Sequence, residues 1–309
     1  MSKISPSWSK EHKIALLNDL LHDHEQDLLK TFEGEIPVSV KTLADYADKA
    51  EYELNHPDEF NGIKTGYYNL DRYLDGLGKG ELIVLSGATS CGKTQLSQCI
   101  CLNLALKDVS TVFFTFEMPP TEIYKRFRAM IMSPTIKRQP EETRDLPILV
   151  DPGSVSTVSG IEQMIKQAKE FAGVELAIID HLQFFIKNGE NTANEVGLVT
   201  RELKMMALRL EMPIILISHI RKLNHKGVPS IDDLKDSSSI GQDADTVIMV
   251  WRNQSEDDKT DSNTDKNRYV LAKIRKNRRK GFLQNVYFKS DDNFYLNEIS
   301  ESVFTMGAK

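Results

Sequence analysis

One segment of the chain has the residue types and the spacing of a phosphate-binding loop. The pattern G-x-x-x-x-G-K-T is matched by Gly87, Ala88, Thr89, Ser90, Cys91, Gly92, Lys93 and Thr94. Glycines at the two fixed positions allow turns that aim backbone N–H groups inward, and the start of a helix favours an anion. Lys93 can then reach the β- and γ-phosphates of a nucleotide, and the Thr94 hydroxyl can ligate Mg²⁺. The flanking residues favour this interpretation, because an apolar run precedes the loop and a helical pattern follows it.

Two carboxylates each end an apolar run and can complete a nucleotide site. Asp180 closes the run ELAIID, a position from which a carboxylate helps to hold Mg²⁺. Glu117 closes the run VFFTFE. If its strand neighbours the strand before the phosphate-binding loop, Glu117 can orient and deprotonate an attacking water. The alternative for each residue is a solvated acid at a strand end.

A histidine closes a third apolar run. His219 follows PIILIS, where an imidazole can contact the γ-phosphate and report its presence. A lone histidine is more often structural or on the surface, so its residue type leaves both roles open. His181, directly after Asp180, has the same ambiguity.

The elements that must position these side chains can be read from hydrophobic periodicity. Apolar, β-branched runs occupy 82–85, 111–116, 148–150, 175–179, 213–218, 246–251 and 269–274, with helical patterns at 93–107, 159–172 and 195–211. Continuous apolar strands separated by helices predict an α/β fold with a mainly parallel sheet flanked by helices. The last two strands, expected at 268–275 and 282–289, form an antiparallel hairpin at an edge of the sheet.

Residues 1–58 are expected to form a small helical segment, and residues 59–309 the ATPase domain. Apolar residues recur at three- and four-residue spacing over 9–32. A second helix is predicted after Ser39, with its end at His56-Pro57. This segment is either a small bundle on its own domain or an oligomerisation arm that packs on a neighbouring subunit. Periodicity does not separate the two.

Composition excludes several classes of protein. The chain has 309 residues and a net charge of −6, from 39 Lys and Arg against 45 Asp and Glu, so it is no polycation. Contact with nucleic acid must therefore come from a local basic surface. The three cysteines suit neither a disulfide framework nor a zinc site. Apolar stretches are too short to span a membrane, and the N-terminus lacks a secretion signal, so we expect a cytoplasmic protein, in the host cytoplasm if a virus encodes it.

Taken together, these segments resemble the hexameric replicative helicases of the DnaB type, whose motor domain has a RecA-like fold. The resemblance runs over roughly residues 60–298 and includes, in family order, IKTGYYNLDRYLDGLGKGELIVLSG, FTFEMP, IIDHLQFF, TRELKMMALRLEMPIILISH, DDLKDSSSIGQDADTVIMVWRNQ and LAKIRKNRRKG. In the family the Glu-Met-Pro segment carries the catalytic glutamate, which is Glu117 here. The resemblance thus implies ATP and Mg²⁺ as cofactors.

The resemblance also implies roles for residues outside the phosphate-binding loop. Lys273 and Arg275 correspond to the Lys and Arg of the A-K-x-R segment, which reach into the ATP site of the adjacent subunit. Arg252 resembles an arginine that contacts the nucleotide base in the phage and mitochondrial (Twinkle) branch. The loop that holds the phosphates of single-stranded DNA corresponds to Lys235, Asp236, Ser237 and Ser238.

Some positions depart from the bacterial pattern. His219 stands where the bacterial branch usually has Gln, and both His219 and His181 fit the phage and mitochondrial branch. Lys235 replaces a usual Arg and Ser238 a usual Gly, which alters the geometry of the DNA loop. The first 58 residues do not resemble the N-terminal dimerising domain of the family.

These observations favour an ATP-driven helicase that forms a ring, moves along single-stranded DNA and unwinds duplex DNA in replication. The expected partners are single-stranded DNA, further copies of the chain in a hexameric ring, and a primase or helicase loader, with no membrane. One alternative is a RecA-like ATPase that acts as a recombinase or a switch. Another is a helicase-like interaction protein that binds or caps a replicative helicase ring.

Overall fold

The computed structural model describes residues 43–186, 192–219, 238–252 and 265–307, and the chain divides into two units, residues 1–60 and 61–309. The helix expected over 9–32 lies outside the described residues. In the first unit the predicted second helix is present as a 3₁₀ turn, Leu43–Tyr46, followed by α3, Ala47–Asn55, and α4, Pro57–Phe60. Helix α3 ends before His56-Pro57, as expected, and buries none of its side chains.

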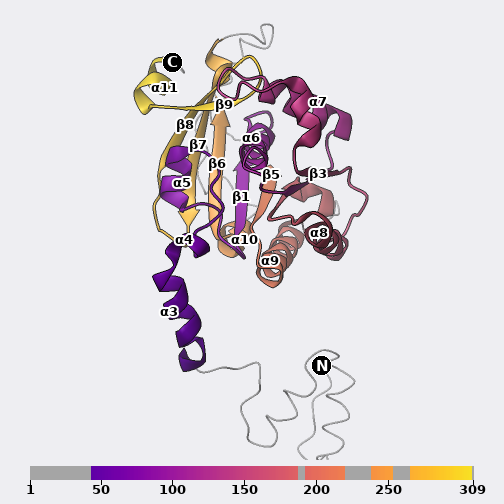
Figure 1. The fold of residues 1–309 in the computed structure, drawn as a ribbon, viewed down its shortest axis with the longest axis vertical. Helices are drawn as coiled ribbons and strands as arrows, with labels where there is room; N and C mark the ends of the chain where they lie inside the picture. The colour runs from indigo at the N-terminus through magenta and orange to yellow at the C-terminus, as the bar shows by residue number, and fades with distance from the viewer. Residues whose placement is uncertain (1–42, 187–191, 220–237, 253–264, 308–309) are drawn as a thin grey trace, which may run out of the picture. The chain divides into compact units, whose positions relative to one another are not determined.

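A mixed sheet forms the centre of the second unit (Figure 1). Within the described residues its nine strands lie in the order β3-β2-β4-β5-β1-β6-β7-β8-β9. Their bounds are β1 Leu82–Gly87, β2 Thr111–Thr115, β3 Ile148–Asp151, β4 Leu176–Asp180, β5 Ile214–His219, β6 Thr246–Arg252, β7 Tyr269–Asn277, β8 Asn285–Ser290 and β9 Leu296–Ile299. The pairs from β3 through β6 are parallel, and those from β6 through β9 are antiparallel. The predicted fold class is confirmed.

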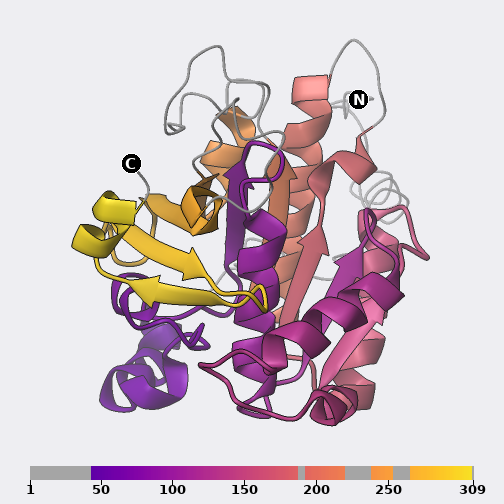
Figure 2. The ribbon, with the colours of Figure 1, turned by 90° about the horizontal axis from the view of Figure 1, so that it is seen from above.

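Helices cover both faces of the sheet (Figures 1 and 2). Side chains of α5 (Tyr68–Leu74), α6 (Lys93–Ala105) and α7 (Pro120–Ile131) share one apolar cluster with one face of the strands. Side chains of α8 (Val158–Ala172), α9 (Thr192–Leu210) and α10 (Ser238–Asp243) share a second cluster with the other face. Because both faces are covered, every residue of β1, β2 and β4 is buried, which explains their unbroken apolar runs.

The C-terminal end of the sheet differs in one respect from the expectation. The predicted hairpin is present as β7 and β8, but it does not form the edge, because a third antiparallel strand, β9, pairs with β8. A short helix, α11 (Glu301–Gly307), follows β9. Phe304 of α11 packs with Tyr269 and Leu271 of β7. This helix therefore covers part of one face of the antiparallel strands.

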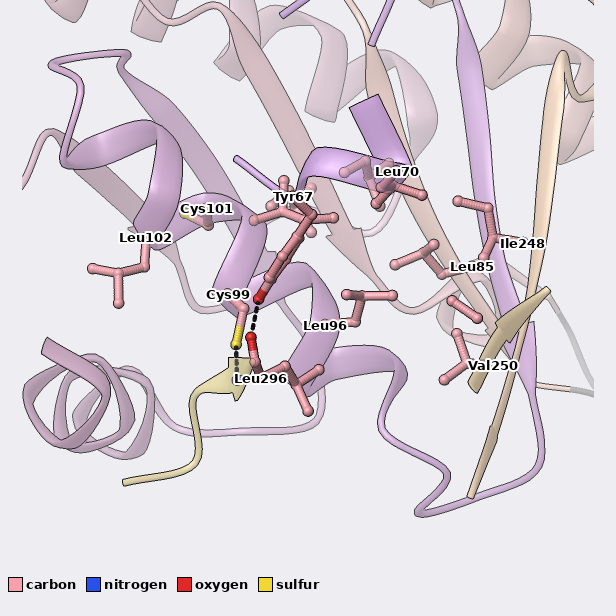
Figure 3. Packing of buried hydrophobic residues seen from close by; sticks show 14 of the residues in the cluster. Tyr67, Leu70, Leu85, Leu96, Cys99, Cys101, Leu102, Ile248, Val250 and Leu296 are labelled. Atoms are coloured by element: carbon pink, nitrogen blue, oxygen red, sulfur yellow. Dashed lines mark hydrogen bonds between the residues drawn. The ribbon is translucent and has the colours of Figure 1, made fainter. Parts of the chain in front are cut away.

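Strand β9 is held against α6 at a buried contact (Figure 3). The Tyr67 hydroxyl donates to the Leu296 carbonyl at 2.9 Å, and the Leu296 N–H donates to Cys99 Sγ at 3.4 Å. Burial raises the pKa of the Cys99 and Cys101 thiols to about 12, so both stay protonated in the core. These two cysteines therefore act as small core side chains, in agreement with the absence of a disulfide framework.

None of the described helices is long and apolar enough to cross a membrane.

Candidate nucleotide-binding site

The phosphate-binding loop joins β1 to α6 (Figure 1), the strand–loop–helix context that its sequence predicts. Gly87 has a φ of 155°, and a Cβ there would collide with the Val250 carbonyl oxygen of the neighbouring strand. Gly92, with a φ of 104°, begins α6. Lys93 Nζ donates to the carbonyls of Gly87 at 2.9 Å and Ala88 at 2.7 Å, so its ammonium lies over the loop. The loop therefore presents a cation beside a helix N-terminus, the arrangement that favours a polyphosphate.

Thr94 and Asp180, both expected to ligate Mg²⁺, are brought into direct contact. The Thr94 hydroxyl donates to Asp180 Oδ2 at 2.8 Å, across a sequence separation of 86 positions. Asp180 is 1% exposed, and its Oδ1 has no hydrogen-bond partner among the described residues. Burial raises the pKa of Asp180 to about 6, against the hydrogen bond from Thr94. A hydroxyl and a buried, incompletely satisfied carboxylate are oxygen ligands that fit Mg²⁺.

Glu117 also lies at the phosphate-binding loop, but the strand order expected to place it there is not the one observed. The prediction required its strand, β2, to neighbour β1, but β4 and β5 lie between them. The side chain nevertheless lines the cavity at the phosphate-binding loop, because it lies in the turn after β2. In that turn the Thr115 hydroxyl donates to the Met118 carbonyl at 2.9 Å and accepts from the Met118 N–H at 3.2 Å. The turn, rather than strand order, positions Glu117.

Two histidines face Glu117 from neighbouring strand ends. Glu117 Oε1 lies 3.5 Å from Nδ1 of His181 and 3.7 Å from Nε2 of His219. Burial lowers the pKa of both imidazoles, and that of His219 falls to about 4 with Lys93 and His181 as further causes. Both rings are therefore neutral near pH 7. The Gln183 amide donates to the His219 carbonyl at 3.2 Å and so ties the end of β5 to the segment after β4.

Arg252 contributes a guanidinium group to the same site. This residue ends β6, and its guanidinium donates to the side-chain oxygen of Gln95 on α6. The Gln95 amide in turn donates to the Ser290 hydroxyl at 2.9 Å and to the Phe294 carbonyl at 2.8 Å. Arg252 is thus held beside the loop by a chain of polar contacts that ends in the turn between β8 and β9.

A cavity of about 400 Å³ joins these parts, and its lining residues are Thr89, Ser90, Gly92, Lys93, Thr94, Gln95, Glu117, Met118, Arg126, Met130, His219, Arg252 and Phe294. Several of them were not predicted to belong to the site. Gln95 follows the matched pattern by one position, so helix geometry could have suggested it. Arg126 comes from α7, and Phe294, which is 58% exposed, comes from a distant turn. The sequence gives no local signal for either.

Lys273 and Arg275 do not line this cavity. On β7, Val270 and Ala272 pack in the apolar cluster that contains α6, whereas Tyr269 and Leu271 pack in the cluster of Phe304. By alternation Lys273 lies on the face of Tyr269 and Leu271, opposite to α6. Burial, and then the charge of Arg275, lower the pKa of Lys273, so the two cations lie close together.

A register shift between β6 and β7 falls at Arg275. Val247 pairs with Lys276 and Ile248 with Ile274, which leaves Arg275 as the extra residue of a β-bulge. Its Nε is buried with no hydrogen-bond partner among the described residues. The bulge therefore interrupts the alternation that would otherwise place Lys273 and Arg275 on the same face of β7.

The predicted DNA loop is almost entirely outside the described residues. Lys235, Asp236 and Ser237 belong to the range that the structure does not describe, and Ser238 is the first residue of α10.

The sequence is similar to a family of known proteins. The family model of the DnaB-like helicase C-terminal domain matches residues 62–295. Among curated relatives, the replicative DNA helicase DnaB of Leifsonia xyli is 27% identical over 227 residues, which are 66% of this chain and 50% of that protein. A probable plasmid replicative DNA helicase of Chlamydia psittaci is 28% identical over 233 residues, covering 68% of this chain and 51% of the relative. The chain thus spans about half the length of these two relatives.

Solved structures share the fold. A DnaB-like replicative helicase, solved in a study of its interactions with primase, gives a TM-score of 0.67 at 20% identity and covers 94% of this chain and 74% of that one. A second solved structure, of an isolated ATPase domain, superimposes with a TM-score of 0.68 at 21% identity and covers 84% of this chain and 99% of that one. Since the family model covers well over half of its residues, the chain belongs to the family of the DnaB-like helicase C-terminal domain.

Proposed function

We propose that this chain is the motor of an ATP-dependent DNA helicase that moves along single-stranded DNA as a ring and unwinds duplex DNA in replication. Residues 59–309 would form the motor domain. The observation that carries the proposal is the convergence of Lys93, Thr94, Glu117 and His219 on one cavity, together with the hydrogen bond from Thr94 to Asp180. This set suits nucleotide hydrolysis rather than binding alone, because it includes a carboxylate free to act on water.

The predicted site residues have distinct roles in this proposal. Lys93 and the backbone of the phosphate-binding loop hold the phosphates, and Thr94 and Asp180 hold Mg²⁺, which neutralises charge on the phosphate oxygens when bound. Glu117 orients the attacking water and accepts its proton. Arg252 contacts the base, and the exposed ring of Phe294 in the same cavity offers a surface on which a base can stack.

Lys273 and Arg275 complete the site of a neighbouring copy in this proposal. Support comes from the position of Lys273 on the sheet face opposite to α6, and from the absence of both cations from the described lining of their own cavity. A cation delivered by a neighbour stabilises the charge that develops on the transferred phosphoryl group. A site shared in this way requires head-to-tail contacts between copies. Such contacts build a ring or an open filament, and we propose a hexameric ring.

The DNA contact is assigned to Lys235, Asp236, Ser237 and Ser238, which would hold phosphates of the single strand. His219 would respond to the γ-phosphate and pass the change towards the DNA. Residues 1–58 would serve as the oligomerisation arm, and a primase or helicase loader would be the further partner, since one structure with this fold was studied with primase.

An unwinding assay with a matched ATPase assay tests the proposal. The protein should separate a forked duplex only with ATP and Mg²⁺, and single-stranded DNA should stimulate its ATPase. The Lys93→Ala variant should do neither. A recombinase or switch would hydrolyse ATP without separating the fork, and an interaction protein that caps another ring would hydrolyse none.

A further inference from the structure

We propose that Glu117, His181 and His219 form a binding site for one transition-metal ion of the Zn²⁺ type, distinct from the Mg²⁺ position at Thr94 and Asp180. The three side chains come from the ends of β2, β4 and β5, which are consecutive in the sheet. One ligand atom from each lies within 4.8 Å of the other two. This is the only such group of three or more His, Cys, Asp or Glu residues found in the described part of the chain.

The separations agree with the coordination geometry of zinc. Nitrogen and oxygen ligands about 2.0–2.2 Å from a tetrahedral Zn²⁺ ion lie about 3.3–3.6 Å from one another. Glu117 Oε1 is 3.5 Å from His181 Nδ1 and 3.7 Å from His219 Nε2. The third separation, between a nitrogen of each imidazole, is no more than 4.8 Å. Two of the three distances between ligand atoms are therefore already close to those around a bound Zn²⁺ ion.

The ring nitrogen of His181 gives a second reason. His181 Nδ1 is buried, and it accepts or donates no hydrogen bond among the described residues, although it faces the Glu117 carboxylate. The two imidazole rings meet edge to face with centroids 4.8 Å apart, which keeps both at the end of the sheet. A metal ion between the rings and the carboxylate would satisfy a buried nitrogen that has no hydrogen-bond partner among the described residues.

The chemistry of the ligands selects the class of ion. Two imidazoles and one carboxylate suit Zn²⁺ and its neighbours in the first transition row, whereas Mg²⁺ takes oxygen ligands and keeps several waters. Glu117 is 46% exposed and His219 faces the cavity, so further positions on the ion stay open to water. Lys93 Nζ lies in the same cavity and repels a cation. We therefore expect reversible binding, weaker than that of a structural zinc site.

Occupancy would have a consequence that rests on the proposed function. An ion that holds the Glu117 carboxylate and faces His219 leaves neither residue free to act at the phosphates. Transition-metal ions should therefore inhibit ATP hydrolysis in the presence of excess Mg²⁺. Binding of the ion does not depend on the chain being an ATPase, so the two claims can be tested separately.

Binding is measured first, with Co²⁺ as an optical substitute for Zn²⁺. The full chain is titrated without nucleotide, and absorption is followed in the visible range. We expect intensified d–d bands that saturate at one ion per chain and disappear when Zn²⁺ is added. The variants His181→Gln and Glu117→Gln should each weaken the affinity at least about tenfold. Glu117 is half-exposed, so its variant tests the site even if His181→Gln folds poorly.

A matched control separates this site from others in the chain. His22, Asp23 and His24 are adjacent in the sequence and lie outside the described residues, so they could bind Co²⁺ by themselves. The double variant His22→Gln and His24→Gln should keep the saturating signal. The proposal is overturned if that double variant loses the signal, if Glu117→Gln and His181→Gln keep full affinity, or if wild-type protein gives only the weak spectrum of hydrated Co²⁺. Inhibition of the ATPase is measured afterwards, and its absence with intact Co²⁺ binding would bear on the proposed role of Glu117 alone.

Discussion

Glu117 is the residue whose removal should separate nucleotide binding from hydrolysis. Its carboxylate faces the cavity, while the contacts that hold the phosphate-binding loop, from Lys93 to Gly87 and Ala88, do not involve it. Glu117→Gln keeps the size of the side chain and removes the base, so ATP binding should stay within a few-fold of wild type. Hydrolysis should fall by roughly 10²- to 10⁴-fold. Equilibrium binding of a fluorescent ATP analogue and steady-state ATPase measure the two quantities, and near-normal turnover would remove Glu117 from its role.

Asp180 should reduce the stability of the nucleotide-free protein. Its pKa is raised from 3.8 to about 6, so its ionised form is disfavoured in the folded state at neutral pH. A shift of that size corresponds to at most roughly 3 kcal/mol. Asp180→Asn should therefore raise the free energy of unfolding above pH 6, and the gain should shrink as the pH falls from about 6 towards 3.8.

The same shift predicts how Mg²⁺ binding depends on pH. Mg²⁺ requires the ionised carboxylate, so wild-type affinity for Mg²⁺ with nucleotide should weaken as the pH falls below about 6. Denaturant melts of both proteins across this pH range, with Mg²⁺ titrations of the wild type, check the two trends. A variant that is no more stable than wild type at pH 7 would contradict the argument.

At the scale of elements, the contact between Tyr67 and β9 should contribute measurably to stability. Tyr67→Phe removes the hydroxyl that donates to the buried Leu296 carbonyl and leaves that carbonyl without this partner. The expected loss is about 1–3 kcal/mol, seen as a lower melting temperature and faster amide exchange in β9. Tyr68→Phe is the matched control, because Tyr68 is the next residue and 74% exposed, so its melting temperature should match that of wild type. Equal melting temperatures for both variants would refute the role of the contact.

Whether a segment forms a strand or a helix was predictable where its own sequence determines it. The strand and helix that flank the phosphate-binding loop, and the strands that end at Asp180 and His219, are specified by local apolar runs. Strand order is not local, because an apolar run does not say which run lies beside it. For this reason the placement of β2 beyond β4 and β5 could not be predicted. The condition set for Glu117, that β2 neighbours β1, was wrong, although the Glu117 side chain does line the cavity.

The elements that sequence reasoning missed depend on distant contacts. Strand β9 is four residues long and only its first residue, Leu296, is buried; its position depends on Tyr67 and Cys99, which are far away in the chain. Phe294 enters the cavity for the same reason, since it lies in the turn before β9. Arg126 belongs to α7, whose pattern of a charged surface helix gives no sign that one of its residues lines this cavity.

At the scale of the whole molecule, the placement of Lys273 and Arg275 predicts that a single chain cannot complete its own site. Their chain's own cavity already has Lys93, Arg126 and Arg252 as cations, and neither Lys273 nor Arg275 is among its described lining residues. If the two act on a neighbour, a defect in the phosphate-binding loop and a defect in β7 damage different halves of one shared site. Two inactive subunits can then restore an intact site where they meet.

The prediction is that mixing Lys93→Ala subunits with Arg275→Ala subunits recovers ATPase activity. At each seam where an Arg275→Ala subunit supplies the phosphate-binding loop and a Lys93→Ala subunit supplies the arginine, all parts of the site are present. Random mixing at equal amounts places such a seam at about one contact in four, so up to roughly a quarter of wild-type activity should return. Each variant alone, and a mixture of Lys93→Ala with a Lys93→Ala and Arg275→Ala double variant, should stay inactive. Exchange of subunits is verified by energy transfer between labelled copies, and mixed assemblies without recovery would place the whole site within one chain.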